Sequence, residues 1–589
     1  MTRIAIVNKQ RCHPDECAQL CAKKCPVNKS GIECIKYINN KAYIDETTCV
    51  GCGICPKICP FHALEIINLP EELNQAPIHR YSENGFALYN LPIPLFGKVV
   101  GILGRNGIGK STAIKILAGI LKPNFGEVGK ETTYRELIEH FKGTEAQAFF
   151  EKLEKKEIVV SYKPQQVELI PKSFQGKVKE LLKKVDEKNE FDKIVENLEL
   201  KNILERELNQ VSGGELQRVA IAATVLKKAN VYFFDEPTSF LDVKQRLKIS
   251  KFIRSLANEN TSVMVIEHDL IILDYLSDYL HLVYGKESAY GVVSSVKATK
   301  NGINTYLSGY LKEENVRFRD REIKFDGSAQ EESTSSQMLL EWSDFKKDFG
   351  TFHLNIKNGK MFRSDVIGVL GENGIGKTSF VKELVLASKK ESKLEIETAS
   401  FVGEDLRVSY KPQYIESSDE LVRIYLQDAM KYELQLIRPL NIEPLYDLTL
   451  NELSGGELQR VEIAKCLGQD ADVYLLDEPS AYLDVEQRLI LSKVLREMMD
   501  LKKGSALVID HDILIVDYIS KRLLVFKGIP AIEGHVEGPF KMGEGMNSFL
   551  KDLMITFRRD EVSNRPRVNK EDSQKDKEQK ASGKLYYNK

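Results

Sequence analysis

The sequence lacks any apolar stretch long enough to cross a membrane. A spanning helix needs about 20 predominantly apolar residues, and even the apolar stretch 505–519 is interrupted by Asp510, His511, Asp512 and Asp517. The first nine residues, MTRIAIVNK, lack the long apolar centre of a signal peptide. These absences predict a cytoplasmic protein with no membrane partner, and a transport function would need a separate membrane subunit.

An excess of charge of either sign is also absent. The 589 residues include 84 Lys and Arg and 86 Asp and Glu, which gives a formal net charge of −2. Contacts with nucleic acid are therefore expected only at local basic patches. The length predicts about three to five domains, and a hydrophobic content of 42% allows large cores.

Cysteine is almost absent after residue 60. Nine of the ten cysteines precede that point, and Cys466, on a predicted helix, is interpreted as a core thiol. In a cytosolic chain such clustering favours metal binding over a disulfide framework. Zinc is one candidate, because Cys-x2-Cys pairs are common zinc ligands.

The spacing of these cysteines favours iron–sulfur clusters over zinc. Cys49-x2-Cys52-x2-Cys55-x3-Cys59-Pro60 has the bacterial ferredoxin spacing for 4Fe–4S clusters. A second, less regular run of four cysteines precedes Pro26. By analogy with two-cluster ferredoxins, the predicted ligand sets are Cys49, Cys52, Cys55 and Cys25, and Cys12, Cys17, Cys21 and Cys59. Cys34 is left as a structural thiol. No flavin or nicotinamide fingerprint accompanies the clusters, so a structural role is favoured.

Two segments, 104–111 and 371–378, match the phosphate-loop pattern G-x-x-x-x-G-K-[ST]. Each follows an apolar stretch expected to be a buried strand and precedes a predicted helix. Glycines let backbone N–H groups approach phosphates, the helix N-terminus adds positive potential, and the lysine can reach the β- and γ-phosphates. The candidate nucleotide-binding residues are Gly104, Asn106, Gly107, Gly109, Lys110, Ser111 and Thr112 in the first loop and Gly371, Asn373, Gly374, Gly376, Lys377, Thr378 and Ser379 in the second.

The same three motifs follow each phosphate loop. They are a Ser-Gly-Gly-Glu signature, an apolar strand ending in Asp-Glu, and a histidine after another apolar strand. Singly, each is more often a loop, a solvated turn or a core histidine, but their repetition in one order favours function. The series resembles the ATP-binding cassette (ABC) ATPases over about residues 81–550. The matching residues are Ser212, Gly213, Gly214, Asp235, Glu236 and His268, and then Ser454, Gly455, Gly456, Asp477, Glu478 and His511.

This resemblance implies a role for each matching residue. The aspartates would hold Mg²⁺, the glutamates would polarise the attacking water, and the histidines would contact the γ-phosphate. Gln165 and Gln413 lie in matching Tyr-Lys-Pro-Gln segments and would join Ser111 and Thr378 as magnesium ligands. Tyr81 and Phe349 are the candidates for stacking on adenine, with Phe86, Tyr89 and Phe352 nearby.

ABC cassettes of this kind act as head-to-tail pairs. The expected fold is therefore α/β, with two P-loop ABC-type nucleotide-binding domains arranged head-to-tail and a small N-terminal α+β ferredoxin-like iron–sulfur domain. Lys110 would share one ATP with Ser454, and Lys377 would share the other with Ser212. Because both halves keep every motif, we expect two ATP, two Mg²⁺ and two hydrolysing sites.

The first cassette carries about 19 extra residues between its phosphate loop and its Tyr-Lys-Pro-Gln segment. Apolar residues with helical spacing from Tyr134 to Phe141 predict one helix. A capping box formed by Thr144 and Gln147 predicts the start of a second. This helix–loop–helix insert, about 131–157, either contacts a partner or packs on its own domain.

A basic segment follows each cassette, and the two segments resemble each other. We interpret them as paired hinges whose arginines contact phosphate backbones or form salt bridges within the hinge. These are Arg317, Arg319, Arg321, Arg558, Arg559, Arg565 and Arg567. A polar loop spans 328–337, and the charged tail from 570 is expected to be disordered. The predicted domains are 1–69, 70–315 and 336–550, with a hinge and linker at 316–335, a second hinge at 551–569 and the tail at 570–589.

The order of all these parts resembles one subfamily, the ABCE ribosome-recycling ATPases, also called the RNase L inhibitor family. The resemblance implies a monomeric ATP hydrolase that binds terminated ribosomes beside a release factor or its stalled-ribosome relative. ATP-driven closure would split the ribosome, and the protein would stay on the small subunit until hydrolysis. The insert and hinges would contact ribosomal RNA, and initiation factors are further expected partners. The alternatives are the ATPase subunit of a transporter or DNA-repair assembly, and an ATP-coupled iron–sulfur electron-transfer protein.

Overall fold

The computed structural model describes residues 2–9, 11–45, 48–69, 76–320, 322–325, 337–388, 401–402 and 406–586. The chain forms two compact units, one made of 1–239, 251–268 and 276–322 and the other of 240–250, 269–275 and 323–589. Arg321 and most of the expected polar loop 328–337 lie outside the described residues. Within the described ranges, no helix is long and apolar enough to span a membrane.

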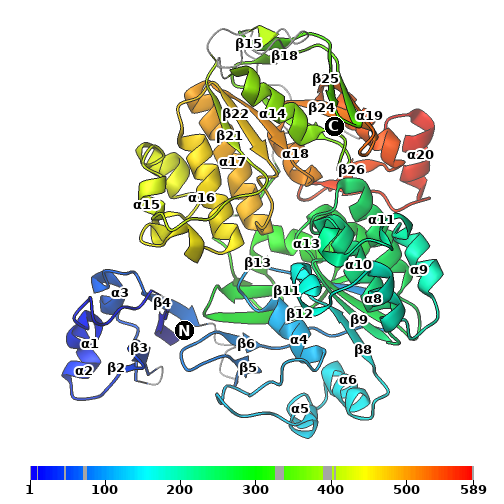
Figure 1. The fold of residues 1–589 in the computed structure, drawn as a ribbon. Helices are drawn as coiled ribbons and strands as arrows, with labels where there is room; N and C mark the ends of the chain where they lie inside the picture. The colour runs from blue at the N-terminus through cyan, green and yellow to red at the C-terminus, as the bar shows by residue number, and fades with distance from the viewer. Residues whose placement is uncertain are drawn as a thin grey trace. The chain divides into compact units, whose positions relative to one another are not determined.

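The N-terminal residues form a small α+β domain, drawn in blue in Figure 1. Strand β1 (Thr2–Val7) pairs antiparallel with β4 (Leu64–Leu69), which ties the two ends of the domain together. Between them lie the hairpin of β2 (Ile35–Ile38) and β3 (Lys41–Ile44) and three short helices, α1 (Leu20–Lys24), α2 (Pro26–Lys29) and α3 (Ile54–Ile58). The core consists largely of cysteines and small side chains, namely Ala5, Cys12, Cys21, Cys25, Cys34, Ala42, Cys55 and Ala63, with a few larger aliphatic residues.

This cysteine-rich domain belongs to the same unit as the first cassette and contacts it through polar groups. The Lys286 ammonium lies 2.6 Å from Glu65 Oε1, and Lys9 Nζ donates to the carbonyl oxygen of Glu83 at 2.9 Å. The Ile44 amide donates to Asn84 Oδ1 at 3.2 Å. These contacts join both ends and the middle of the small domain to the cassette.

An eight-stranded sheet organises the first unit, in the order β5-β6-β12-β11-β7-β10-β9-β8. The five strands from β11 to β8 run parallel. Three of them, β7, β9 and β10, are buried along their whole length, as expected for a parallel sheet covered on both faces. The strands are β5 (His79–Arg80), β6 (Ala87–Tyr89), β7 (Val99–Leu103), β8 (Val160–Lys163), β9 (Val231–Asp235), β10 (Ser262–Ile266), β11 (Tyr279–Lys286) and β12 (Tyr290–Ala298).

The second unit repeats this sheet in the order β16-β17-β25-β24-β19-β23-β22-β21. The sheet of one unit therefore matches that of the other position by position, which confirms the two ABC-type cassettes expected from the motifs. The strands are β16 (Phe345–Phe349), β17 (Phe352–Ile356), β19 (Val366–Leu370), β21 (Val408–Lys411), β22 (Val473–Asp477), β23 (Ser505–Ile509), β24 (Arg522–Ile529) and β25 (Glu533–Lys541).

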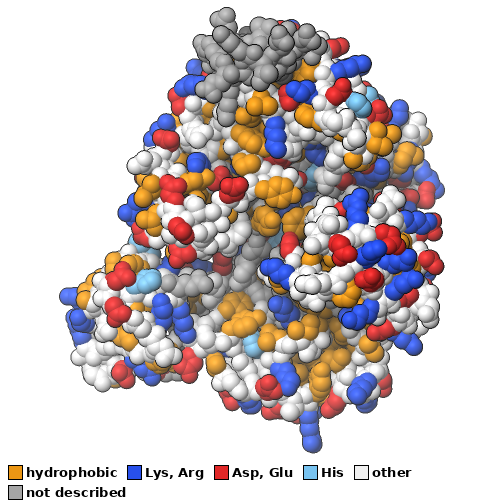
Figure 2. Space-filling view, in the orientation of Figure 1, with side chains coloured by type: hydrophobic (Ala, Val, Ile, Leu, Met, Phe, Trp, Pro, Cys, Tyr) orange, Lys and Arg blue, Asp and Glu red, His pale blue; other side chains and the backbone are white. Residues whose placement is uncertain are grey.

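Helices cover both sheets (Figure 1). In the first half they are α4 (Lys110–Leu117), α7 (Ile170–Ser173), α8 (Val178–Val185), α9 (Phe191–Asn197), α10 (Gly213–Leu226), α11 (Val243–Ser255), α12 (Leu270–Leu276) and α13 (Thr299–Ser308). In the second they are α14 (Lys377–Ser388), α15 (Val422–Tyr425), α16 (Gly455–Gly468), α17 (Val485–Lys502), α18 (Ile513–Ile519) and α19 (Met542–Leu553). On the visible face, acidic and basic side chains are interspersed, in keeping with the balanced charge (Figure 2).

The insert forms the expected helix–loop–helix of α5 (Tyr134–His140) and α6 (Glu145–Glu154). Its apolar face packs into the core of its own cassette through residues that include Leu137, Phe149 and Phe150. The predicted capping box at Thr144 is wrong. The Thr144 hydroxyl donates to the Phe141 carbonyl, and Gln147 Oε1 accepts from the Gly143 amide. The capping box instead starts the first helix, between Thr133 and Glu136.

Three of the hinge arginines are held by carboxylates rather than left free for phosphate. Arg567 donates to both oxygens of Asp274, at 2.6 and 2.9 Å, and Arg559 to both oxygens of Asp517, at 2.7 and 3.0 Å. Arg565, fully buried, also pairs with Asp274 at 3.0 Å. These three therefore form salt bridges, but mainly with aspartates of α12 and α18 rather than within the hinge, where Arg567 also pairs with Asp560 at 3.2 Å. Arg317 is exposed and stacks on Tyr310.

The tail is ordered through residue 586, which corrects the expectation of disorder from 570. Helix α20 (Gln574–Ser582) begins at a Ser573 cap, and Leu585 and Tyr586 are buried against the second unit. The Asn547 side chain accepts from both of their amides, at 2.7 and 3.1 Å. The Tyr586 hydroxyl bonds to Asp517 and accepts from Arg559. One buried aromatic residue thus anchors a segment whose composition is otherwise typical of disorder.

Replacing Tyr586 with alanine should loosen both the tail and the hairpin of β26 (Phe557–Arg559) and β27 (Pro566–Val568) in the second hinge. The change removes a buried ring, which typically costs about 3–5 kcal/mol, and a hydroxyl that holds Asp517 and Arg559. Tyr586→Phe keeps the ring and should cost less, about 1.5–3 kcal/mol, because it loses hydrogen bonds to charged groups. We expect a lower midpoint of thermal unfolding and faster amide exchange in 574–582. Lys577→Ala, at an exposed position of α20, is the control, and equal behaviour of Tyr586→Ala and this control would contradict the ordered tail.

Candidate functional site

The first phosphate loop connects the end of β7 to the start of α4 at Lys110. The Lys110 ammonium donates to the carbonyl oxygens of Gly104 and Arg105, at 3.0 and 2.5 Å, so it lies inside the curl of its own loop. Gly109 has a φ of +92°, and a Cβ there would come within 2.7 Å of the Phe86 ring. Only glycine therefore permits this tight turn. Together with the helix N-terminus, the loop forms a cradle for a phosphate.

The second phosphate loop has the same geometry. The Lys377 ammonium donates to the carbonyl oxygens of Gly371 and Glu372, at 2.9 and 2.6 Å. Gly376 has a φ of +90°, and a Cβ there would lie 2.9 Å from the Phe352 ring. The amide of Asn373 also donates to Asp242 Oδ2 at 2.9 Å, and both residues belong to the second unit.

A buried aspartate lies beside the hydroxyl of each loop. Thr378 Oγ1 donates to Asp477 Oδ2 at 2.7 Å, and Ser111 bonds to Asp235. Burial raises the pKa of both carboxyls. Asp235 Oδ1 is buried without a hydrogen-bond partner in the part of the chain that the structure describes. A carboxylate, a hydroxyl and an unused oxygen beside a phosphate cradle fit Mg²⁺, which prefers oxygen ligands.

The next residue in each cassette, Glu236 or Glu478, points its carboxylate at two predicted site residues. Gln165 Nε2 donates to Glu236 Oε1 at 2.8 Å, and His268 Nε2 lies 3.5 Å from the same oxygen. In the second cassette the distances from Glu478 Oε1 to Gln413 and His511 are 2.8 and 3.6 Å. The structure thus brings together the glutamine, glutamate and histidine of each cassette, as the sequence predicted.

The matching glutamates differ in proton affinity although their surroundings are nearly identical. Burial, aided by Asp477 and Asp510, raises the pKa of Glu478 to about 7. Burial acts on Glu236 in the same direction, but the contact with His268 and the nearby Lys110 and Lys163 outweigh it and lower the pKa to about 2. Burial and Lys377 keep the pKa of His511 well below the ordinary value, so that this histidine is neutral.

Each signature serine caps a long helix. Ser212 starts α10 and Ser454 starts α16, and each forms a capping box with the glutamate three residues later. The two glycines after each serine lie in the first helical turn, where amides are free to bind an anion. The pairing of Lys110 with Ser454 and of Lys377 with Ser212 concerns the two units together and stays a prediction.

The two candidate adenine-stacking residues occupy matching positions on hairpins beside the phosphate loops. Tyr81 directly follows β5 and Phe349 ends β16, and both are partly exposed. The Tyr81 hydroxyl lies 3.0 Å from Thr112 Oγ1, at the start of α4. Phe86 and Phe352 lie on the same hairpins, and their rings pack closely against Gly109 and Gly376 of the phosphate loops. Tyr81 and Phe349 thus remain candidates for stacking, whereas Phe86 and Phe352 shape the loop.

Sequence reasoning missed four buried polar residues behind the glutamates. Lys163 and Lys411 donate to the carbonyl oxygens of the Asp-Glu pairs, and Gln217 and Gln459 donate to the carbonyl oxygens of the glutamates. Burial lowers the pKa of both lysines to about 8. The sequence feature that could have revealed them is their constant spacing in the two cassettes. Lys163 and Lys411 lie two residues before Gln165 and Gln413, and Gln217 and Gln459 lie five residues after the signature serines.

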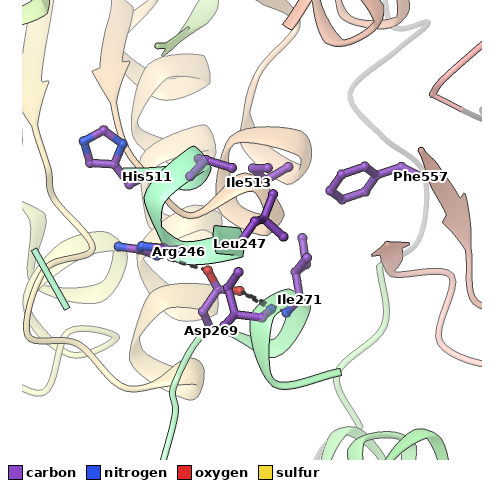
Figure 3. A pocket seen from close by; sticks show the side chains of 9 residues that line it. Arg246, Leu247, Asp269, Ile271, His511, Ile513 and Phe557 are labelled. Atoms are coloured by element: carbon purple, nitrogen blue, oxygen red, sulfur yellow. Dashed lines mark hydrogen bonds and ion pairs between the residues drawn. The ribbon is translucent and has the colours of Figure 1, made fainter. Parts of the chain in front are cut away.

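A small apolar cavity in the second unit lies beside an ion pair near the second histidine (Figure 3). Arg246 Nη1 lies 3.0 Å from Asp269 Oδ2, and Asp269 Oδ1 accepts from the Ile271 amide. Arg488 and Asp512 form the equivalent pair at 2.7 Å. The residues lining the cavity are Val243, Arg246, Leu247, Asp269, Ile271, Ile272, His511, Ile513 and Phe557. It contains no phosphate-loop residue and is not the nucleotide site.

The cysteines of the N-terminal domain are all free thiols. Burial is the main cause that raises the pKa of Cys12, Cys21 and Cys55, the last to about 12. Neighbouring thiols add to the effect, with Cys59 and Cys17 acting on Cys12, Cys12 and Cys17 on Cys21, and Cys49, Cys52 and, more weakly, Cys21 on Cys55.

These thiols fit a cluster that replaces their protons. The amides of Ala42 and Ala63 point at the sulfurs of Cys12 and Cys59, at 3.3 and 3.4 Å, as N–H donors do around cluster thiolates. The buried thiols whose pKa is raised, Cys12, Cys21 and Cys55, favour the protonated form until a metal displaces the proton. Among the described residues, no group of three or more His, Cys, Asp or Glu side chains could hold a single metal ion.

Protein-family models match both the two cassettes and the cysteine-rich N-terminal domain. Residues 95–239 and 354–481 match the ABC transporter family. Residues 42–65 match a 4Fe-4S binding domain, and residues 2–33 match a possible Fer4-like domain in RNase L inhibitor. The protein is therefore an ATP-hydrolysing ABC enzyme with two cassettes and a 4Fe–4S binding domain.

Relatives that span the whole chain narrow the class further. Translation initiation factor RLI1 of Saccharomyces cerevisiae is 43% identical, over 100% of this chain and 98% of the relative. A model of ribosome-bound archaeal Pelota and ABCE1 matches with a TM-score of 0.92 and 50% identity, over 100% of this chain and 99% of that one. The crystal structure of archaeal ribosomal stalk protein aP1 with archaeal ribosome recycling factor aABCE1 matches with a TM-score of 0.82 and 50% identity, over 88% and 100%. This chain belongs to the ABCE family, also called the RNase L inhibitor family.

Proposed function

We propose that this protein recycles ribosomes. It binds a terminated or stalled ribosome, splits it into subunits when its two cassettes close on ATP, and stays on the small subunit until it hydrolyses that ATP. The observation that carries the proposal is the likeness, along the whole chain, to an archaeal relative described as ribosome-bound together with Pelota. A release factor or its stalled-ribosome relative is the expected neighbour. Initiation factors and the ribosomal stalk are further expected partners, in the cytoplasm.

The residues of each cassette have separate tasks in hydrolysis. Loop amides and Lys110 or Lys377 bind the β- and γ-phosphates, and Ser111 with Asp235, or Thr378 with Asp477, would hold Mg²⁺. Glu236 or Glu478 accepts a hydrogen bond from the attacking water and orients it in line with the γ-phosphate.

Two further residues in each cassette assist this step. Gln165 or Gln413 fixes the glutamate carboxylate through its amide nitrogen and would offer its amide oxygen to Mg²⁺, and His268 or His511 would contact the γ-phosphate. The signature serine of the opposite cassette completes each site, which links ATP binding to closure.

The N-terminal domain would hold two 4Fe–4S clusters. Cys49, Cys52, Cys55 and Cys25 would bind one cluster, and Cys12, Cys17, Cys21 and Cys59 the other. The placement of Cys59 in the second set is supported by its proximity to Cys12, whose pKa it helps to raise. Bound clusters would supply the cross-links that a domain with so few bulky apolar side chains needs to keep its shape.

Sedimentation of ribosomes with the anaerobically purified protein tests the recycling function. With a release factor and a non-hydrolysable ATP analogue, the wild-type protein should convert ribosomes into subunits and sediment with the small subunit, because closure without hydrolysis traps it there. Lys110→Ala with Lys377→Ala, which removes phosphate binding at both sites, is the control and should leave ribosomes intact. Intact ribosomes with the wild-type protein at the top of the gradient would rule out the proposed function.

Cys52→Ser and Cys34→Ser should differ in iron content. Cys52 is a proposed cluster ligand, so its replacement should lose about half of the iron and the corresponding visible absorbance, because three thiolates hold a 4Fe–4S cluster poorly. Cys34 is buried but unassigned, and its serine variant should retain full iron. Iron and sulfide analysis of the two purified variants measures this. Full iron in Cys52→Ser, or a matching loss in Cys34→Ser, would show that the ligand sets are wrong.

A further inference from the structure

Each cassette buries a lysine completely, at the same place in its fold. Lys163 ends β8 and Lys411 ends β21, and neither side chain is exposed. Burying an ammonium group costs several kcal/mol unless it is paired and hydrogen-bonded. An apolar side chain would fill the same space without that cost. Because lysine recurs at this position in both units, we infer that its ammonium group has a function.

Both ammonium groups bind the backbone of the residues that carry the chemistry. Lys163 Nζ donates to the carbonyl oxygens of Asp235 and Glu236, at 2.9 and 3.2 Å. Lys411 Nζ donates to those of Asp477 and Glu478, at 2.9 and 3.4 Å.

A buried amide reinforces this contact in each cassette. Gln217 Nε2 reaches the Glu236 carbonyl at 2.6 Å, and Gln459 Nε2 reaches the Glu478 carbonyl at 2.8 Å. Each glutamate carbonyl thus has one charged and one neutral donor.

These carbonyl groups need such donors because the chain bends sharply there. Strand β9 ends at Asp235 and β22 at Asp477, so the carbonyl groups that follow leave the ladder. Glu236 and Glu478 both have a φ of +47°, in the left-handed region. For residues with a Cβ this conformation costs about 1–2 kcal/mol and persists only when the surroundings enforce it. The bend sets the direction in which the carboxylate points.

The same short segment also holds the carboxylate. Gln165 follows Lys163 by two residues, across Pro164, and donates to Glu236 Oε1 at 2.8 Å. Gln413 follows Lys411 across Pro412 and binds Glu478 Oε1 at the same distance. The proline fixes one backbone dihedral between the two contacts. The lysine and the glutamine of one stiff tripeptide therefore bind each glutamate, the lysine at its backbone and the glutamine at its carboxylate.

We propose that Lys163 and Lys411 are positioning residues for ATP hydrolysis. Each holds the bend at the catalytic glutamate, so that the carboxylate faces the water in line with the γ-phosphate. The inference rests on the proposed catalytic role of Glu236 and Glu478. Since the lysines act on the orientation of the water and not on the phosphate cradle, they should govern kcat and leave ATP binding almost unchanged.

The test compares two double variants of the full-length protein. Lys163→Met with Lys411→Met removes both ammonium groups but keeps side chains of similar length. Ser161→Ala with Ser409→Ala is the matched control. These serines are buried on the same strands, two residues earlier, and bond the carbonyl groups of Thr224 and Cys466, away from the glutamates.

We expect the methionine variant to lower kcat for ATP between about tenfold and a hundredfold, with KM within about threefold, since a misdirected group costs rate rather than affinity. The serine control should keep its kcat within about twofold of wild type, even where its melting temperature falls. Unchanged kcat in the methionine variant would overturn the proposal. A loss of ATP affinity as large as the loss of kcat would overturn it too, because that result indicates general damage.

Lys163→Gln with Lys411→Gln covers the case in which the methionine variant does not fold. Its amide can donate one hydrogen bond without the charge, and its kcat should fall between those of wild type and the methionine variant; wild-type kcat would count against the inference. Glu236→Gln with Glu478→Gln tests the underlying assignment separately. Turnover by that pair would refute the catalytic role, whereas its inactivity beside fully active lysine variants would refute only the positioning role.

Discussion

The left-handed bend at the end of one buried strand is the constraint on which each ATP site depends. Parallel strands β7 and β9 finish at the same edge of the sheet, as do β19 and β22, so the phosphate loop and the Asp-Glu pair meet there. The positive φ at Glu236 and Glu478 then turns the carboxylate toward the phosphate cradle. A buried lysine and a buried glutamine hold that turn from behind. The same set occurs twice, in keeping with the two hydrolytic sites that we propose.

Within the second unit, ion pairs join the segments that directly follow His268 and His511 to other parts of that unit. Asp269 and Asp512 directly follow the histidines and hold Arg246 and Arg488. Asp274 and Asp517, one turn and a half further on, hold the hinge arginines Arg567 and Arg559. In the second cassette, a chain of contacts therefore runs from His511 through α18 to the C-terminal hinge, by way of the bidentate pair of Asp517 and Arg559.

The sequence predicted those residues whose chemistry is encoded locally. Lys110, Ser212, Glu236 and Gln165 each belong to a short motif, and the repeat supplied an independent check on each. It did not predict the partners of Lys163 or Arg567, because Lys163 meets Asp235 and Arg567 meets Asp274 only after the chain has folded. The sequence also predicted a disordered tail, because a polar composition gives no sign that the ring of Tyr586 is buried. Composition reports averages, whereas one well-placed aromatic side chain can order a whole segment.

Counting the nucleotides occluded by the Glu236→Gln, Glu478→Gln variant tests the central claim, that one chain carries two complete ATP sites. The variant would be incubated with radiolabelled ATP and ribosomes, freed of unbound nucleotide by rapid gel filtration, and analysed for ATP and ADP per chain. Two molecules of intact ATP per chain would agree with two complete sites that close before hydrolysis. One ATP per chain, or ADP in place of ATP, would contradict the account, because it would mean that a site is incomplete or that another group drives hydrolysis.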